Sequence, residues 1–225
     1  MSEIPSLRLF RANGRSSLTT HILLNYLNIP FDETVLELGA QGWEAADGSL
    51  SNAQYKATVN PAGLVPALVL GGQTVVTEST AVLSYLASLK PEAKLQGETL
   101  LERAQVLEWL AWLAGTVHGY GVAMYFAPNR FADDEASHPA LKERGLALSR
   151  DYFQRIDKHL AERAHPVGER ETLVDFNLII IWFMGVHMGI DMEGNYAKFG
   201  ALVHGLLAND VVQKTLKDEG LMPAQ

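Results

Sequence analysis

Cysteine is absent from this chain of 225 residues. Its absence excludes a disulfide framework, a cysteine-ligated metal site and a catalytic thiol supplied by the protein, so any thiol chemistry would have to come from a ligand. An excess of basic residues is missing as well, since 18 Lys and Arg stand against 26 Asp and Glu, for a formal charge of −8. Phosphate groups are bound by clustered cations, so we expect neither nucleic acid nor a membrane surface as partner.

Long hydrophobic runs are also lacking. Residues 1–8 have no apolar core of the kind that a secretory signal needs, and we therefore expect a cytoplasmic protein. The most apolar stretch, Phe176 to Ile190, is too short to span a bilayer and contains His187, which indicates a buried helix. Hydrophobic residues make up 48% of the chain, enough for one large or two modest cores.

The first ninety residues show strand and helix patterns in alternation. The patterns predict a strand at 7–10, a helix at 18–27, strands at 33–38, 67–70 and 74–77, and a helix at 80–89. The initial β-α-β order implies a parallel pair of strands. Gly71-Gly72 is typical of a two-residue hairpin. Between residues 39 and 58 we expect a loop with room for a short helix.

Beyond residue 98 the sequence shows helix patterns and no convincing strand. Helices are predicted at 100–117, 141–164, 172–188, 197–207 and 211–216. Thr172 and Asp175 have the spacing of a capping box. The sequence thus predicts an α/β domain over residues 1–89, followed by an all-α domain over residues 98–225.

Two short segments in the first part of the chain suggest a binding site. Pro66 heads a short apolar run, and Val65-Pro66 is a candidate cis peptide at a turn, which would leave the backbone of Val65 open to an extended ligand. Glu78-Ser79 opens a helix, whose N-terminus favours an anion. Together these features suit a small peptide that carries an amine and a carboxylate. Each alone could be structural, as the start of an edge strand and as a helix cap.

In combination, these features and the element order resemble the soluble glutathione transferases over essentially the whole chain. The segments Leu9–His21 and Glu108–His118 look like the bacterial beta class. The resemblance implies a thioredoxin-like domain that binds glutathione, a helical domain that contributes an electrophile pocket, and a cytosolic homodimer active in detoxification. It implies no metal and no organic cofactor, with glutathione as co-substrate.

The resemblance also implies residue roles. Ser16 stands where the beta class carries a cysteine, and it could donate its hydroxyl to the sulfur of glutathione, with Arg15 adding positive potential. Ser17 and Asn13 are alternatives for the same role. From the residues alone, Ser16 and Ser17 could equally be simple N-caps.

Glutathione recognition is expected at Val65 and Pro66 for the cysteinyl part, and at Glu78 and Ser79 for the γ-glutamyl part. No polar side chain is present in Ala62–Leu64 to hold the glycine end, so either Lys56 or Gln54 takes that role or the affinity for glutathione is lower.

The electrophile pocket is expected to include Arg11, His118 and Tyr125, although His118 and Tyr125 could also be ordinary core residues. The predicted function is transfer of the glutathione thiolate to small hydrophobic electrophiles. The alternatives are a glutathione-binding regulatory module with little turnover, and glutathione-dependent reduction of peroxides or disulfides.

Overall fold

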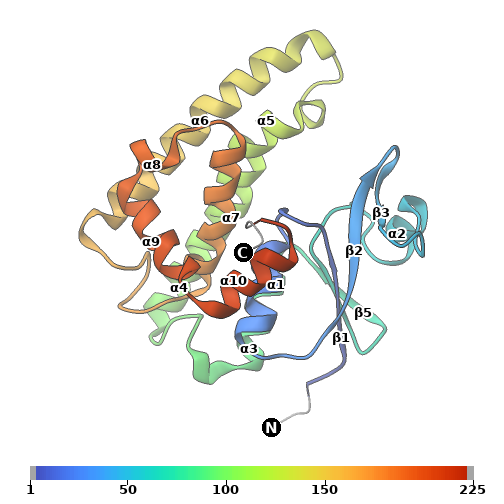
Figure 1. Cartoon of the computed structure of the whole chain (residues 1–225), viewed down its shortest axis with the longest axis horizontal. Coiled ribbons are helices and arrows are strands. Elements are labelled where there is room, and N and C mark those ends of the chain that lie inside the picture. Colours follow the sequence, from blue (N-terminus) through green and yellow to red (C-terminus); the bar gives the residue numbers. More distant parts are fainter. Residues whose placement is uncertain (1–3, 222–225) are drawn as a thin grey trace. The chain divides into compact units, whose positions relative to one another are not determined.

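The computed structural model describes residues 4–221, which separate into two compact units (Figure 1). The first unit comprises the chain up to Lys94 together with the residues from Leu207 onward, and the second comprises Leu95–Leu206. The sequence predicts the last helix, at residues 211–216, as part of the all-α domain. The structure groups it with the first unit because α10 (Asp210–Asp218) packs against α1 (Leu18–Tyr26).

A five-stranded mixed sheet in the order β3-β2-β1-β4-β5 forms the centre of the first unit. Its strands are β1 (Leu7–Arg11), β2 (Asp32–Gly39), β3 (Gly42–Ala45), β4 (Ala67–Leu70) and β5 (Thr74–Thr77). The pair β1–β2 is parallel, as the β-α-β order predicts, and the other neighbouring pairs are antiparallel. The thioredoxin-like class of this unit is therefore confirmed.

Helices cover both faces of the sheet. They are α1, α2 (Asn52–Thr58) and α3 (Ser79–Leu89), while α10 packs on α1 and a short 3₁₀ turn η1 (Pro91–Ala93) follows α3. Because side chains alternate along a strand, Leu9 and Phe10 of β1 point to opposite faces. Phe10 joins a buried cluster on the α2 side, where its ring centroid lies 5.6 Å from that of Tyr55.

Two local predictions for this unit were wrong. The expected loop at 39–58 contains β3 as well as α2; the strand is too short to show alternation, and Trp43 pairs with Leu38 across a tight turn. The hairpin between β4 and β5 has three connecting residues rather than two. Gly71 and Gly72 both have positive φ, and the N–H of Gln73 closes the turn on the Leu70 carbonyl at 3.2 Å.

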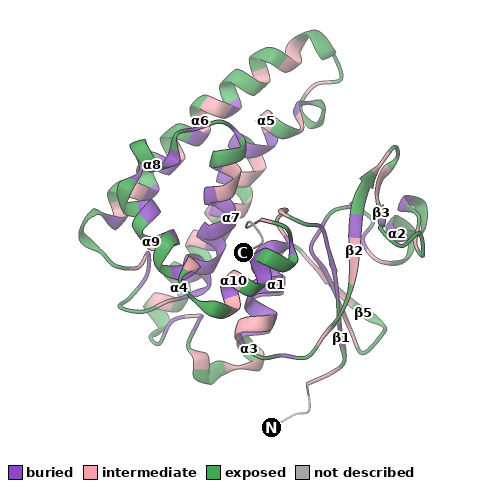
Figure 2. Ribbon diagram, viewed as in Figure 1, coloured by how far each residue is buried: buried purple, intermediate pink, exposed green. Residues whose placement is uncertain are grey.

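The second unit is helical throughout its described residues. Its helices are α4 (Leu100–Trp112), η2 (Leu113–Val122), α5 (Ala123–Phe126), η3 (Pro128–Arg130), η4 (Glu135–Ser137), α6 (His138–His159), η5 (Leu160–Glu162), α7 (Leu173–His187), α8 (Met192–Asn195) and α9 (Ala197–Leu207). Every residue from Leu173 to Trp182 is buried, so α7 forms the core (Figure 2). None of the helices formed by residues 4–221 has the length and apolar character that a membrane crossing requires.

Helix starts in this unit follow the predicted capping chemistry. Thr172 and Asp175 form the expected capping box at α7, and Thr99 and Glu102 form a second one at α4. The helix predicted over 100–117 is shorter in the structure, because α4 ends at Trp112. The π-helical segment η2 follows it directly. Wider turns shift the direction of each later side chain relative to an α-helix, so spacing arguments based on 3.6 residues do not carry across residue 113.

Candidate active site

The loop between β1 and α1 is closed by hydrogen bonds within itself. The hydroxyl of Ser17 accepts from the N–H of Ala12 at 3.0 Å and lies 3.1 Å from the Ala12 carbonyl, to which it donates. The N–H of Arg15 donates to the same carbonyl at 3.2 Å. Gly14 has a φ of +65°, which an L side chain rarely adopts. These contacts fix the position of Ser16 at the start of α1.

Ser16 lies against the predicted peptide-binding edge. Its Oγ donates to the carbonyl oxygen of Val65 at 2.7 Å, although the two residues are 49 positions apart. Ser16 is half-buried, whereas Ser17 is fully buried and has its hydroxyl engaged with Ala12 on both sides. Ser17, the N-cap of α1, makes no side-chain capping bond. Of the two serines, only Ser16 has a hydroxyl that can reach a ligand on Val65.

The peptide edge is held from behind by two side chains. The carbonyl of Leu64 accepts from the Tyr55 hydroxyl and from Asn60 Nδ2, each at 2.7 Å. Burial raises the pKa of the Tyr55 phenol, which keeps its hydroxyl a donor. Val65-Pro66 is a cis peptide, as predicted. Within residues 4–221 the N–H of Val65 has no acceptor, so this group is open for a ligand.

Glu78 and Ser79 lie beside this edge. The register pairs Ala67 with Thr77, which puts Glu78 across from Pro66 on the next strand. Glu78 has a φ of +66°, an uncommon conformation for a residue with a side chain and one that clusters at functional sites. Its exposed carboxylate makes no capping bond to α3, which begins at Ser79. A routine helix cap therefore does not account for Glu78.

The two arginines of the loop differ in surroundings. Arg15 is exposed, with its guanidinium carbon 5.7 Å from the centroid of the Trp43 ring. Arg11 is buried: its Nε and Nη2 donate to the carboxylate of Glu33 at 2.6 and 3.0 Å, and its Nη1 donates to Asn13 Oδ1 at 2.5 Å. The hydrogen bond from Arg11 holds the pKa of the Glu33 carboxyl below its usual value.

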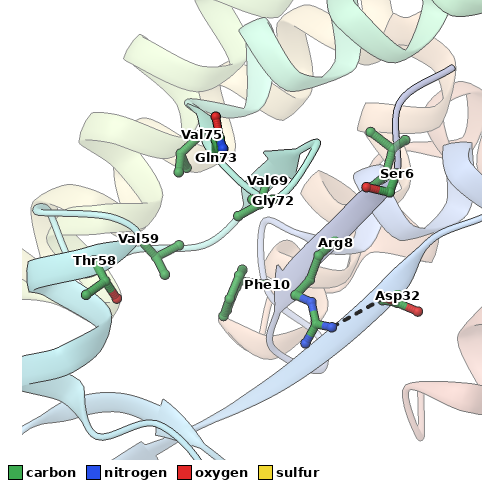
Figure 3. A pocket seen from close by; sticks show the side chains of 11 residues that line it. Ser6, Arg8, Phe10, Asp32, Thr58, Val59, Val69, Gly72, Gln73 and Val75 are labelled. Atoms are coloured by element: carbon green, nitrogen blue, oxygen red, sulfur yellow. Dashed lines mark hydrogen bonds and ion pairs between the residues drawn. The ribbon is translucent and has the colours of Figure 1, made fainter. Parts of the chain in front are cut away.

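A pocket of about 360 Å³ lies on the α2 side of the sheet and is separate from these residues (Figure 3). Its lining includes Phe10, Val59, Val69 and Val75, with the exposed ion pair Arg8–Asp32 at 3.3 Å. It contains none of the predicted site residues. Among the residues that the structure describes, no group of three or more acidic or histidine side chains could hold a metal ion.

Known proteins resemble this chain in both sequence and structure. Residues 16–89 match the family model for the glutathione S-transferase N-terminal domain. Glutathione S-transferase GST-4.5 of Xanthomonas campestris pv. campestris is 28% identical over 96% of this chain and 100% of its own length. The chain is therefore similar to glutathione S-transferases over nearly its whole length.

Solved structures of glutathione S-transferases are similar to this chain over nearly its full length. A bacterial beta-class glutathione S-transferase of Sphingomonas chungbukensis has a TM-score of 0.82 at 29% identity, covering 96% of this chain and 100% of its own. A sphingomonad glutathione S-transferase complexed with glutathione has a TM-score of 0.81 at 28% identity with the same coverage. The predicted family, and its similarity to the beta class, are thus supported by whole-chain comparisons.

The predicted pocket residues fall in different units. Arg11 belongs to the first unit and is engaged with Glu33 and Asn13, while His118 lies in η2 and Tyr125 in α5 of the second. Their joint role in an electrophile pocket stays a prediction.

His118 is a half-buried imidazole in η2. Its ring nitrogens have no hydrogen-bond partner in the described part of the chain. Burial lowers the pKa of His118, and the positive charge of Arg130 lowers it further, so the ring is neutral near pH 7. The Tyr125 ring stacks edge-on against Phe126 at 5.0 Å.

Proposed function

We propose that this protein activates the thiol of glutathione at Ser16 and transfers the resulting thiolate to small hydrophobic electrophiles. The observation that carries the proposal is the 2.7 Å hydrogen bond from Ser16 to the carbonyl of Val65. It supports a single site in which the hydroxyl stands beside the backbone edge expected to hold the cysteinyl part of the ligand.

The cysteinyl part would bind Val65 as an added strand does, through the N–H and carbonyl of that residue. The γ-glutamyl ammonium would pair with the carboxylate of Glu78, and its carboxylate would accept from the hydroxyl and N–H of Ser79. The unpaired, positive-φ Glu78 across from Pro66 supports this arrangement.

The same register indicates where the glycine end would lie. In this arrangement the γ-glutamyl end would lie near Glu78, which is opposite Pro66, and the cysteinyl part would lie along Val65. The chain of the ligand would then continue away from Pro66, so that its glycine would lie beside Leu64 and Gly63. The Lys56 Cε lies 2.5 Å from the point that a Cβ on Gly63 would occupy, so the lysine side chain runs along this segment.

Gln54 is a poorer candidate for the glycine end. Its Oε1 accepts from the N–H and the hydroxyl of Ser51, both at 2.9 Å, in the capping box of α2. Moving it to a ligand would cost this helix its cap. Of the two residues left open by the sequence, we therefore propose Lys56 for the glycine carboxylate.

The chemistry needs a thiol that ionises near neutral pH. A free thiol has a pKa of about 8.5, and donors or positive charge beside the sulfur lower it. The Ser16 hydroxyl would turn from Val65 to the sulfur, with the guanidinium of Arg15 nearby. The thiolate then forms a C–S bond to the electrophile, whose leaving group departs with its electron pair. Holding both reactants together supplies the remaining acceleration without a cofactor.

The test is thiolate formation in Ser16→Ala, with Ser16→Thr as the matched variant that keeps a hydroxyl. We expect the pKa of bound glutathione to rise by about one unit in Ser16→Ala, a roughly tenfold loss of thiolate near neutral pH, and to stay low in Ser16→Thr. Ultraviolet absorbance of the complex measures it. An unchanged thiolate signal in Ser16→Ala would refute the serine role.

Turnover needs a separate test. Conjugation of any member of a broad electrophile panel supports a transferase, whereas retention on immobilised glutathione with no turnover supports a regulatory module. Reduction of hydroperoxides or disulfides by glutathione would point to the third function.

We also propose a cytoplasmic homodimer. Leu100, Leu101 and Leu107 of α4 are 83%, 68% and 55% exposed, an apolar surface of the kind that subunit contacts cover. Sedimentation at micromolar concentration should give twice the monomer mass. A monomer would contradict this assembly.

A further inference from the structure

Glu219 has a buried carboxylate at the C-terminus of a helix, a position that disfavours a negative charge. It is the C-cap of α10, and its side chain has no solvent exposure. The C-terminus of a helix is the negative end of its dipole, which disfavours an acid, and burying a carboxylate is costly unless it is paired. Neither helix formation nor core packing therefore explains why this position is Glu, so the explanation must come from what the carboxylate contacts.

Its contacts lead to the loop that carries Ser16. One carboxylate oxygen accepts from the N–H of Gly14 at 2.9 Å, across 205 positions of sequence. The other lies 2.9 Å from Nδ1 of His21 on α1 and 3.8 Å from Nη1 of Arg11. Glu219 thus joins the middle of the β1–α1 loop to the body of the following helix.

A cluster of charges surrounds this contact. Arg11 makes two hydrogen bonds to Glu33, and Nε2 of His21 lies 3.9 Å from the same carboxylate. The two glutamates therefore face one guanidinium and one imidazole. The guanidinium of Arg11, 3.8 Å away, and the hydrogen bonds from Gly14 and His21 partly offset the cost of burying the Glu219 carboxylate.

We infer that Glu219 is a positioning residue for Ser16. Gly14 stands two residues before Ser16 and, lacking a side chain, has the widest backbone freedom in the loop. Its N–H has no other acceptor among residues 4–221, so losing the Glu219 carboxylate frees this point of the loop. This inference rests on the proposed role of Ser16 at the sulfur.

A purely structural role for Glu219 is the alternative, since the carboxylate also helps α10 dock on α1. The structure offers a matched control for docking: Asn25 Nδ2 on α1 donates to the Thr215 hydroxyl of α10 at 3.0 Å. Thr215→Val removes this contact without touching the loop. Asp218→Asn removes an exposed carboxylate from the same helix end.

The experiment compares Glu219→Ala and Glu219→Gln with both controls in the full-length protein. Gln keeps an oxygen for the Gly14 N–H and can donate its amide to an unprotonated Nδ1 of His21. Hydrogen exchange at the Gly14 amide reports the loop directly, and thiolate absorbance and steady-state kinetics report its effect on Ser16.

We expect Glu219→Ala to speed exchange at Gly14 and to lower kcat on the order of tenfold, with the KM for glutathione within about threefold, because Val65, Glu78 and Ser79 are untouched. Glu219→Gln should restore most of both. Thr215→Val should lower thermal stability without changing exchange at Gly14 or the thiolate signal, and Asp218→Asn should change neither stability nor activity.

Two results would overturn the inference. The first is a Glu219→Ala protein that keeps wild-type exchange at Gly14 and wild-type thiolate. The second is a Thr215→Val protein that loses thiolate as Glu219→Ala does, which would mean that docking alone matters. Failure of the proposed function is distinguishable, because the wild-type protein would then form no thiolate while the exchange difference at Gly14 would remain.

Discussion

Removal of the Asp175 carboxylate should be one of the most damaging single changes in the second unit. Asp175 is fully buried at the start of α7, where it accepts from the N–H of Thr172 at 2.8 Å, from the Thr172 hydroxyl at 2.9 Å and from His165 Nδ1 at 2.8 Å. Losing the hydrogen bond from the Thr172 hydroxyl costs about 1 kcal/mol. Leaving the buried Thr172 N–H without an acceptor adds about 1–3 kcal/mol. Asp175→Ala should therefore lower the free energy of unfolding by about 3 kcal/mol.

The matched control is the second capping box of the same unit. Glu102 of α4 accepts from the N–H groups of Glu98 and Thr99 at 2.7 and 2.9 Å, but these bonds are exposed to solvent. Water can replace them, so Glu102→Ala should cost much less stability than Asp175→Ala. Urea unfolding monitored by circular dichroism measures both variants. Equal losses in the two variants would refute the argument that burial, rather than the motif itself, makes Asp175 important.

Two further predictions concern charged groups. The hydrogen bond that His165 donates to Asp175 raises the pKa of His165, so its stabilising contribution is fully present below about pH 6.5 and is lost as pH rises through the higher folded-state value. In urea titrations, His165→Gln should therefore lose stability at low pH and little at high pH, and a loss that is the same at all pH values would contradict the pairing. Lys56→Ala should weaken binding of glutathione about threefold without affecting γ-glutamylcysteine, which lacks the glycine, whereas Gln54→Ala should not discriminate between them. Calorimetric titration measures both ligands, and an equal loss for the two would exclude Lys56 from the glycine end.

Local signals account for the parts of the fold that the sequence predicts well. The capping box at Thr172 and the cis bond at Val65-Pro66 each depend on residues within a few positions of one another, and each element of the β-α-β order has its own local period. The strand β3 was missed because four residues show no period, and its pairing with β2 is the only reason it is a strand. The end of α4 was missed because a change to wider π-helical turns leaves no mark in hydrophobic spacing.

The residues of the candidate site likewise fall into those that local sequence signals reveal and those that only the packing of the fold reveals. Local sequence signals, namely a proline at a strand start, the start of a helix and serines in a loop, were enough to predict five site residues. These are Ser16, Val65, Pro66, Glu78 and Ser79. Their partners could not be found in this way. Tyr55 and Asn60 both converge on the Leu64 carbonyl, which depends on how α2 packs on the sheet.

Arg11 is a predicted site residue whose expected role depends on its hydrogen-bond partners in the structure. A cation two residues before Asn13, in the loop expected to hold a thiolate, suggests by itself a group that stabilises negative charge. In the structure its guanidinium is already engaged with Glu33 and Asn13 and lies near Glu219. The positive charge of Arg11 is therefore largely paired with carboxylates of its own unit, and in the proposed binding mode the exposed Arg15 is the main cation near the sulfur. Arg15→Ala should accordingly raise the thiol pKa more than a charge-conserving Arg11→Lys, although Arg11→Lys breaks more hydrogen bonds.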